Sequence, residues 1–413
     1  MSRRRDNANV TAAATAGLLI VVAVLYLTAT VTARQAVLFL VGVGAGIVLY
    51  RAEFGFTSSW REFLTEGRGA GIRAQMLMLA LTCAIFFPVL GTGHAFGQAV
   101  RGSVSPVGVS VLAGAFLFGM GMQLGGGCAS GTLYSAGGGN TRMVVTLLFF
   151  IVGSVIGTAH MPWWSSMPAF KPFSLVTAYG VVAGLAVSIA AFAGVAAATV
   201  AIERRKHGRL QTETRIGRRP DGNRRPWPLV AGAAGLAAVN IATLLISGRP
   251  WGVTSAFALW GAKASSALGA DVARWPYWTA PAQAASLNAP VWADVSSVMD
   301  FGIILGALVA AAVGGRFAPT LRTSGRSMFA AIVGGLMLGY GARIAYGCNI
   351  GAYFSGIASG SLHGWVWFAA ALAGNMAGTG LRPLFGLSRV ERTTPSPRAA
   401  TLRVANSRHH DAV

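Results

Sequence analysis

Two glycine-rich stretches of the chain each carry one cysteine. Cys128 lies in GMGMQLGGGCASGTLYSAGGGN, which begins at Gly119, and Cys348 lies in GYGARIAYGCNIGAYFSGIASG, which begins at Gly339. Because each Gly inside a helix costs about 1 kcal/mol relative to Ala, both stretches predict a break followed by a short helical segment. Such a break frees backbone N–H groups, and a helix N-terminus carries about half a positive charge, so the chemistry predicted here is anion binding.

Polar side chains around the two cysteines support this prediction. Hydroxyl and amide groups nearby add neutral hydrogen-bond donors, and Arg343 adds a formal charge inside an apolar segment, which makes it a functional candidate. The predicted pathway residues are Cys128, Cys348, Cys83, Gly127, Ser130, Ser135, Gly347, Asn349, Ser355 and Arg343.

A purely structural interpretation competes with this one. Glycine-rich segments can serve close helix packing, and a buried cysteine can act as a small apolar side chain. A single Gly-Cys pair favours that interpretation, whereas two pairs in matched positions favour a functional site. Cys83, in LMLALTCAIFFPVL, has no matching cysteine, so both interpretations stay open for it.

Metal binding and catalysis are the alternative chemistries. Met120 and Met122 could join Cys128 as soft ligands for Cu(I), but Tyr340 and Ala342 occupy the matching positions of the second stretch. An enzyme would need a base near the thiol, and the six histidines give no obvious Cys–His pair. We predict no catalytic residue, no metal site and no cofactor, with a soft-metal or other ion transporter and a persulfide-handling membrane enzyme as alternatives.

Two acidic residues belong to the apolar segment 292–314. Asp294 lies near its start and is expected at the membrane interface, whereas Asp300 lies deeper. We expect Asp300 to pair with Arg343 or Lys263, or to take part in proton coupling.

Composition identifies the elements that must position these residues as membrane spans. The 413 residues are 54% hydrophobic and only 11% charged, with mean hydropathy +0.58, whereas soluble proteins carry about 25% charged residues. Three cysteines exclude a disulfide framework. The net charge of +21 does not indicate a nucleic-acid partner, because the basic residues lie in loops between apolar segments.

Ten apolar segments predict about ten crossings of an all-helical polytopic membrane protein. The second is short and predicts a tilted or half-length helix. With the amino terminus in the cytoplasm, 26 Lys and Arg lie inside and six outside, so both termini are predicted to be cytoplasmic. The segments are 12–33, 36–50, 74–95, 108–127, 143–160, 174–202, 228–247, 292–314, 327–346 and 362–381.

The two glycine-rich stretches belong to a longer internal repeat. They share six positions without a gap, and upstream FGFTSSW from Phe54 matches WGVTSAF from Trp251. Matched blocks lie on opposite sides of the membrane in the predicted topology, so the halves are inverted, as in many transporters. The predicted organisation is an extra span at 1–35, a first repeat at 36–160, a connecting span at 161–202, a basic cytoplasmic linker at 203–227, a second repeat at 228–385 and a disordered basic tail at 386–413.

With these residues in place, the chain resembles the YeeE/YedE family of membrane proteins, whose characterised members take up thiosulfate. The resemblance covers about 36–160 and 228–385 through FGFTSSWRE, GGGCASGTLYSAGGGN, VTSAFALWGAK, DFGIILGAL and YGCNIGAYFSGIASGSLHGW. It implies an hourglass-like helical fold in which short re-entrant helices enter from both faces. It also implies a narrow path lined by cysteines, here Cys128 and Cys348; the family's thiosulfate carriers use a third cysteine, and Cys83 is the remaining one in this chain.

The resulting hypothesis is a multi-pass permease of the bacterial inner membrane that imports thiosulfate or a related small sulfur-containing anion. Thiol donors suit the soft terminal sulfur of thiosulfate, and backbone N–H groups and serines suit its oxygens. The expected partners are this anion and membrane lipid, with a cytoplasmic sulfur-carrier protein as a further candidate and no nucleic acid.

Overall fold

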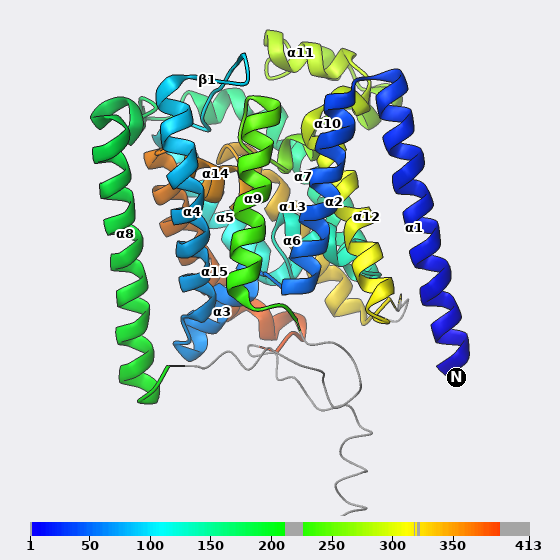
Figure 1. The fold of residues 1–413 in the computed structure, drawn as a ribbon, viewed down its shortest axis with the longest axis horizontal. Helices are drawn as coiled ribbons and strands as arrows, with labels where there is room; N and C mark the ends of the chain where they lie inside the picture. Colours follow the sequence, from blue (N-terminus) through cyan, green and yellow to red (C-terminus); the bar gives the residue numbers. More distant parts are fainter. Residues whose placement is uncertain (1, 211–225, 318, 320–322, 389–413) are drawn as a thin grey trace, which may run out of the picture.

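Apolar runs of the sequence form long helices that cross the molecule from end to end (Figure 1). The computed structural model describes residues 2–210, 226–317, 319 and 323–388. Its long helices are α1 Ser2–Thr30, α2 Ala33–Ala52, α4 Ala70–Thr92, α5 Val109–Gly125, α7 Thr141–Ser165, α8 Leu175–His207, α9 Leu229–Ser247, α12 Val295–Val313, α13 Gly325–Ile344 and α15 Leu362–Leu381.

Within these residues, nine helices are long and apolar enough to cross a membrane. The tenth predicted span forms α15, which packs against α5 inside the bundle but carries polar side chains such as Asn375. The prediction of an all-helical, multi-span membrane protein is confirmed.

The second predicted span differs from its prediction. The segment 36–50 was expected to give a tilted or half-length helix, but α2 has 20 residues, which is enough to cross a bilayer. The helix begins earlier than hydropathy indicates because Thr32 caps it, its hydroxyl accepting the N–H of Gln35.

Short elements connect the long helices. They are the helices α3 Phe56–Glu66, α6 Ala129–Gly137, α10 Thr254–Ala267, α11 Pro281–Asn288 and α14 Ser355–Ala358, the single turns η1 Val272–Arg274, η2 Val291–Ala293, η3 Asn349–Phe354 and η4 Arg382–Phe385, and the strands β1 His94–Ala95, β2 Gln98–Ala99, β3 Val107–Gly108 and β4 Ala169–Phe170. The strands form two small antiparallel pairs, β1 with β2 and β3 with β4.

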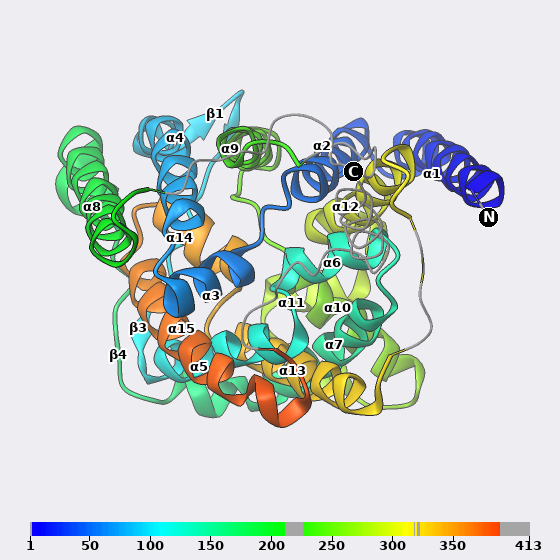
Figure 2. The ribbon, with the colours of Figure 1, turned by 90° about the horizontal axis from the view of Figure 1, so that it is seen from below.

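Helices α1 and α8 lie on opposite flanks of the bundle in both views (Figure 1 and Figure 2). Helix α1 packs on α2 and α12, and α8 packs on α4. These are the two spans that the repeat prediction leaves outside the halves.

The contacts between the remaining helices come in matched pairs. Counted along each half, α5 corresponds to α13 and α7 to α15; α5 packs on α15, and α13 packs on α7. In the same way α2 packs on α12 and α9 on α4, while α3 lies at one end of the bundle and α10 at the other (Figure 1). This exchange of partners supports the proposal of two inverted repeats, whose boundaries stay a prediction.

Glycine permits the closest of these helix contacts. Gly119 of α5 lies against the backbone of α15 at Ala371, and Gly339 of α13 lies against the backbone of α7 at Phe150. A Cβ at either position would overlap a carbonyl oxygen of the neighbouring helix. The two glycines occupy matched positions of the proposed repeats, and both permit the same close contact between helices.

Parts of two predicted segments lie outside the described residues. In the predicted linker 203–227, helix α8 continues to His207, and 211–225 are not described. Of the predicted tail 386–413, the structure describes only 386–388.

Candidate functional site

The two short segments after the cysteines begin at the same point of their local structures. Cys128 is the N-cap of α6 and Cys348 is the N-cap of η3, a six-residue π-helical turn that continues into α14. Both cysteines have extended backbone, and α6 contacts η3. The predicted short helices are therefore present, and the elements that begin at the two cysteines touch in the bundle.

Cys128 is held within a hydrogen-bonded first turn. Its Sγ accepts the N–H of Gly131 at 3.4 Å and lies 3.5 Å from the hydroxyl of Ser130. Thr132 donates its hydroxyl and its N–H to the Cys128 carbonyl, both at 2.8 Å. The backbone of Gly131 and Thr132 would lie 3.3 Å from a Cβ on Gly127, so this tight turn favours glycine there.

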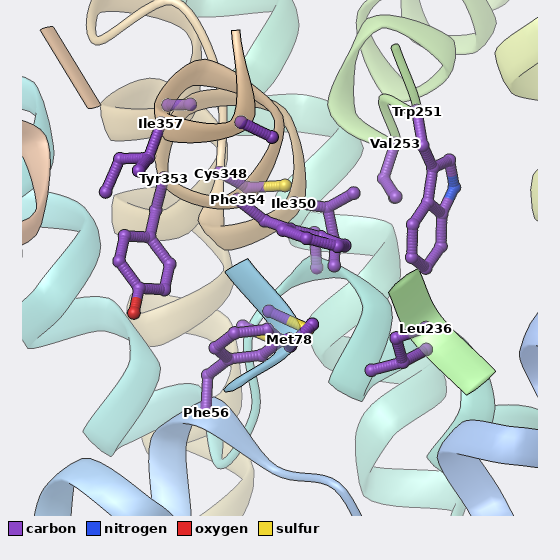
Figure 3. Close-up of a cluster of buried hydrophobic side chains, with 14 of the residues drawn as sticks. Phe56, Met78, Leu236, Trp251, Val253, Cys348, Ile350, Tyr353, Phe354 and Ile357 are labelled. Atoms are coloured by element: carbon purple, nitrogen blue, oxygen red, sulfur yellow. The ribbon is translucent and has the colours of Figure 1, made fainter. Parts of the chain in front are cut away.

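Cys348 has more apolar surroundings. It is fully buried, and Figure 3 shows its side chain in a cluster with Ile350, Phe354 and Val253. Its carbonyl accepts the N–H groups of both Ala352 and Tyr353, which sets the wide π turn.

Gly347, just before Cys348, has a backbone that requires glycine. Its φ is 149°, in the region that L side chains rarely adopt, and a Cβ would lie 2.8 Å from the N atom of Ala352. Its carbonyl accepts the indole N–H of Trp367 at 3.2 Å. The glycine backbone conformation and this hydrogen bond thus hold the turn that precedes Cys348.

Asn349 follows Cys348 and is fully buried. Neither its Oδ1 nor its Nδ2 has a hydrogen-bond partner among the described residues. An unsatisfied buried polar group lowers the free energy of unfolding by about 1–3 kcal/mol. The Asn349 amide is therefore a candidate for hydrogen bonding to an anion that enters the site.

Ser135 and Ser355 each lie seven residues after the cysteine of their own stretch. Ser355 donates its hydroxyl to the Trp251 carbonyl at 2.7 Å and accepts a hydrogen bond from Asn240 Nδ2 at 3.1 Å, which ties α14 to α9. Ser135 is half-buried and lies seven residues after Cys128 in α6, or about 10 Å along the helix axis. Neither serine lies beside the cysteine of its own stretch in the way that Ser130 does.

Cys83 joins the second cysteine element. It is fully buried in α4, and its thiol faces the carbonyl of Ile357 in α14 at 3.9 Å. One continuous apolar cluster contains Cys83, Cys128 and Cys348.

Arg343 has a different partner from the one expected. Its Nη1 donates to the Tyr277 hydroxyl at 2.7 Å, and its guanidinium lies 5.3 Å from the centre of the same ring. Lys263 donates to the carbonyls of Leu287 and Ala289. Neither oxygen of Asp300 has a hydrogen-bond partner within the described chain, so the predicted pairing of Asp300 with Arg343 or Lys263 is wrong. Residues between α10 and α12 supply the partners of both cations instead.

Sequence reasoning missed a buried polar group beside the cysteine elements. Gln75 of α4 is fully buried; its Oε1 accepts the indole N–H of Trp60 at 2.9 Å and the hydroxyl of Tyr353, in η3, at 3.3 Å. Its Nε2 has no partner in the described structure. The available signal was an amide at the start of the apolar run AQMLMLALTC.

A metal site would need a cluster of His, Cys, Asp or Glu side chains. In that part of the molecule, no three His, Cys, Asp or Glu side chains come together in a way that could hold a metal ion.

Comparison with known proteins points to one functional class. A family model described as "Sulphur transport" matches residues 51–377, a range that contains all three cysteines. The thiosulfate transporter TsuA of Spirochaeta thermophila is 29% identical over 350 residues, which cover 81% of this chain and 95% of TsuA. The probable transporters YedE of Escherichia coli and of Salmonella typhimurium are 31% and 30% identical over 142 residues, or 34% of each chain.

Proposed function

The chain belongs to the family of sulphur-transport membrane proteins, and from this premise we propose that it imports thiosulfate or a related small sulfur-containing anion. Its relatives are named transporters, so it is a multi-pass membrane transporter of sulfur compounds rather than an enzyme. The substrate, the inward direction, the bacterial inner membrane and the cysteine-lined path are the proposed parts.

The matched placement of Cys128 and Cys348 is the observation that carries the proposal. Both are buried N-cap residues of short elements that contact each other, and each comes from one of the two proposed repeats. Asn349, whose amide has no hydrogen-bond partner in the described chain, directly follows Cys348. A substrate site near the midplane, where interrupted helices of two inverted halves meet, is the usual arrangement in such transporters.

The chemistry of the site suits thiosulfate. Its terminal sulfur is soft and accepts weak hydrogen bonds from neutral thiols, while its oxygens accept stronger bonds from amide N–H groups and the Ser130 hydroxyl. A neutral thiol does not repel the dianion as a thiolate would. Weak ligands also release the anion, which transport requires as much as binding.

The basic surface at the α3 end of the bundle supports a cytoplasmic orientation and a carrier-protein partner. The last turn of α8 exposes Arg204, Arg205 and Lys206, and the positive-inside rule assigns such clusters to the cytoplasm. We expect an acidic sulfur-carrier protein to dock there. The double variant R204E/R205E should then weaken carrier binding in a pull-down by at least fivefold, and unchanged binding would argue against this docking site.

Labelled thiosulfate tests the substrate. In bacterial cells without another thiosulfate route, the protein should restore uptake of thiosulfate labelled at its terminal sulfur. Unlabelled thiosulfate should compete more strongly than sulfate, sulfite or selenite, because only thiosulfate offers both the soft sulfur and the oxygens. Stronger competition by selenite or sulfite would reassign the substrate within the sulfur and selenium anions.

A further inference from the structure

Asp300 is a buried carboxyl group inside a membrane-spanning helix. It is fully buried in α12, and neither of its oxygens has a hydrogen-bond partner in the described chain. Other carboxylates of that part of the chain are paired with arginines: Glu53 with Arg316, Glu66 with Arg68, Glu203 with Arg73, Asp271 with Arg274 and Asp294 with Arg249. The isolation of Asp300 therefore needs an explanation.

The face of α12 that carries Asp300 is turned toward α10. Residues spaced three and four apart lie on one helix face, so Asp300 shares a face with Ser296 and Ser297. The hydroxyl of Ser296 bonds that of Ser255 at 2.8 Å, and Ser297 accepts the indole N–H of Trp260 at 2.9 Å. Both partners belong to α10, the short helix that begins within the matched block WGVTSAF.

Asp300 also belongs to a helix that packs beside the cysteine elements. Helix α12 packs on α6, which begins directly after Cys128, and α6 contacts η3, the turn that begins directly after Cys348. Two further buried polar groups without partners in the described structure belong to this region, the amide of Asn349 and the indole Nε1 of Trp251. In Figure 3, Trp251 lies on the side of the cluster toward which the Cys348 sulfur points. Asp300, Asn349 and Trp251 belong to three different segments of the chain. Buried polar groups that lack a hydrogen-bond partner within the described chain therefore come from several elements and not from Asp300 alone.

An ionised Asp300 does not fit this environment. A carboxylate without water or a partner is so costly in an apolar interior that the group takes up a proton instead. An ionised carboxylate would also repel a passing dianion, whereas the neutral acid has an O–H donor to offer.

Resting on the proposed function, we propose that Asp300 binds one proton for each anion that passes Cys348, so that the protein is an anion–proton symporter. The proton comes from water on the outer side and forms the O–H bond of the carboxyl group. The same bond breaks when the proton leaves to cytoplasmic water after the anion, and no electron is transferred. Each proton cancels one of the two charges of a dianion that would otherwise move alone against an inside-negative potential.

Other charged and titratable residues lie on the elements that pack on α12. On the elements that pack on α12, the charged or titratable residues with described side chains are Tyr26 of α1, Arg34, Tyr50 and Arg51 of α2, Tyr134 of α6 and Lys263 of α10. Cys128, the N-cap of α6, and Asp294, the N-cap of α12, complete the set. Arg34 bonds Gln98, Lys263 bonds two carbonyls, and Asp294 accepts hydrogen bonds from Ser297. None of the hydrogen bonds or salt bridges found for these groups within the described chain reaches Asp300.

Reconstituted protein tests the coupling. Proteoliposomes of wild type, D300N and D294N take up labelled thiosulfate with and without an acid-outside pH gradient, and each rate is divided by the same protein's gradient-free rate. The gradient should raise uptake at least threefold for wild type and for D294N, which keeps a good N-cap. For D300N the ratio should be about one, because Asn cannot release a proton. An equal gradient response of D300N and wild type would overturn the inference.

Two further measurements decide the matter if D300N fails to fold or shows no uptake. D300E retains a titratable group and should keep a gradient ratio above two. Thiosulfate added outside wild-type proteoliposomes at equal pH should make the external medium more alkaline, and labelled uptake without this change would overturn the coupling alone. If wild-type proteoliposomes show no uptake of labelled thiosulfate at all, the proposed function is contradicted, and the coupling with it.

Discussion

We expect the buried amide of Asn349 to lower the stability of the protein and to take part in transport. Its two amide atoms are buried without partners in the described chain, which lowers the free energy of unfolding by about 1–3 kcal/mol. We expect N349L to raise the free energy of unfolding by about 1 kcal/mol, since an apolar side chain of similar size removes that cost. Uptake should fall at least tenfold. Thermal unfolding in detergent and uptake assays measure the two effects; lower stability with unchanged uptake would contradict this role.

Ser355 should behave in the opposite way. Its hydroxyl links Trp251 and Asn240, so S355A leaves buried polar groups of both without a partner. We expect a loss of about 1–3 kcal/mol in stability and uptake per folded molecule within twofold of wild type. A tenfold loss of uptake at unchanged stability would instead return Ser355 to the predicted pathway.

At the scale of elements, glycine contacts hold the central helices together. Gly119 and Gly339 each face the backbone of the adjacent helix. We expect G119A and G339A to destabilise the protein by about 1–3 kcal/mol, because an added methyl overpacks the contact. Gly44 of α2, which has nothing within 4 Å of an added Cβ, is the matched control. G44A should be neutral or gain up to about 1 kcal/mol of helix propensity; equal effects of all three in thermal unfolding would refute the contact argument.

The long helices were predictable from the sequence, whereas the partners of irregular segments were not. The segment 228–247 was predicted and α9 spans Leu229–Ser247, because a bilayer requires about 20 consecutive apolar residues, which a sequence displays directly. The short helices after the cysteines were also predictable from glycine breaks. That η3 is a π turn was not, since six residues contain too few turns to reveal a period.

The partners of candidate site residues depend on the path of the chain in space. Arg343 bonds Tyr277, which lies in an irregular segment between α10 and α12, and local sequence does not determine where such a segment returns. The cysteine pair was predictable because the repeat matches Cys128 with Cys348 residue by residue. Asp300 could be recognised as buried within a span, but its isolation is visible only in the packed structure.

At the scale of the whole molecule, the charge distribution predicts which face meets the cytoplasm. The three native cysteines are buried, so they should give little background in thiol labelling. A membrane-impermeant maleimide should label A270C, after α10, in intact cells, and R205C, near the end of α8, only after permeabilisation. The reverse pattern would contradict the proposed orientation.

We propose that Cys128 and Cys348 relay the anion, and the initial uptake of labelled thiosulfate into proteoliposomes tests this relay. We expect C128A and C348S each to lower the rate at least tenfold, because each removes one thiol donor from the path, at unchanged amounts of folded protein. S188A, which alters a buried hydroxyl of α8 far along the chain from the cysteine elements, should transport at the wild-type rate. Near-normal uptake by both cysteine variants would contradict the relay.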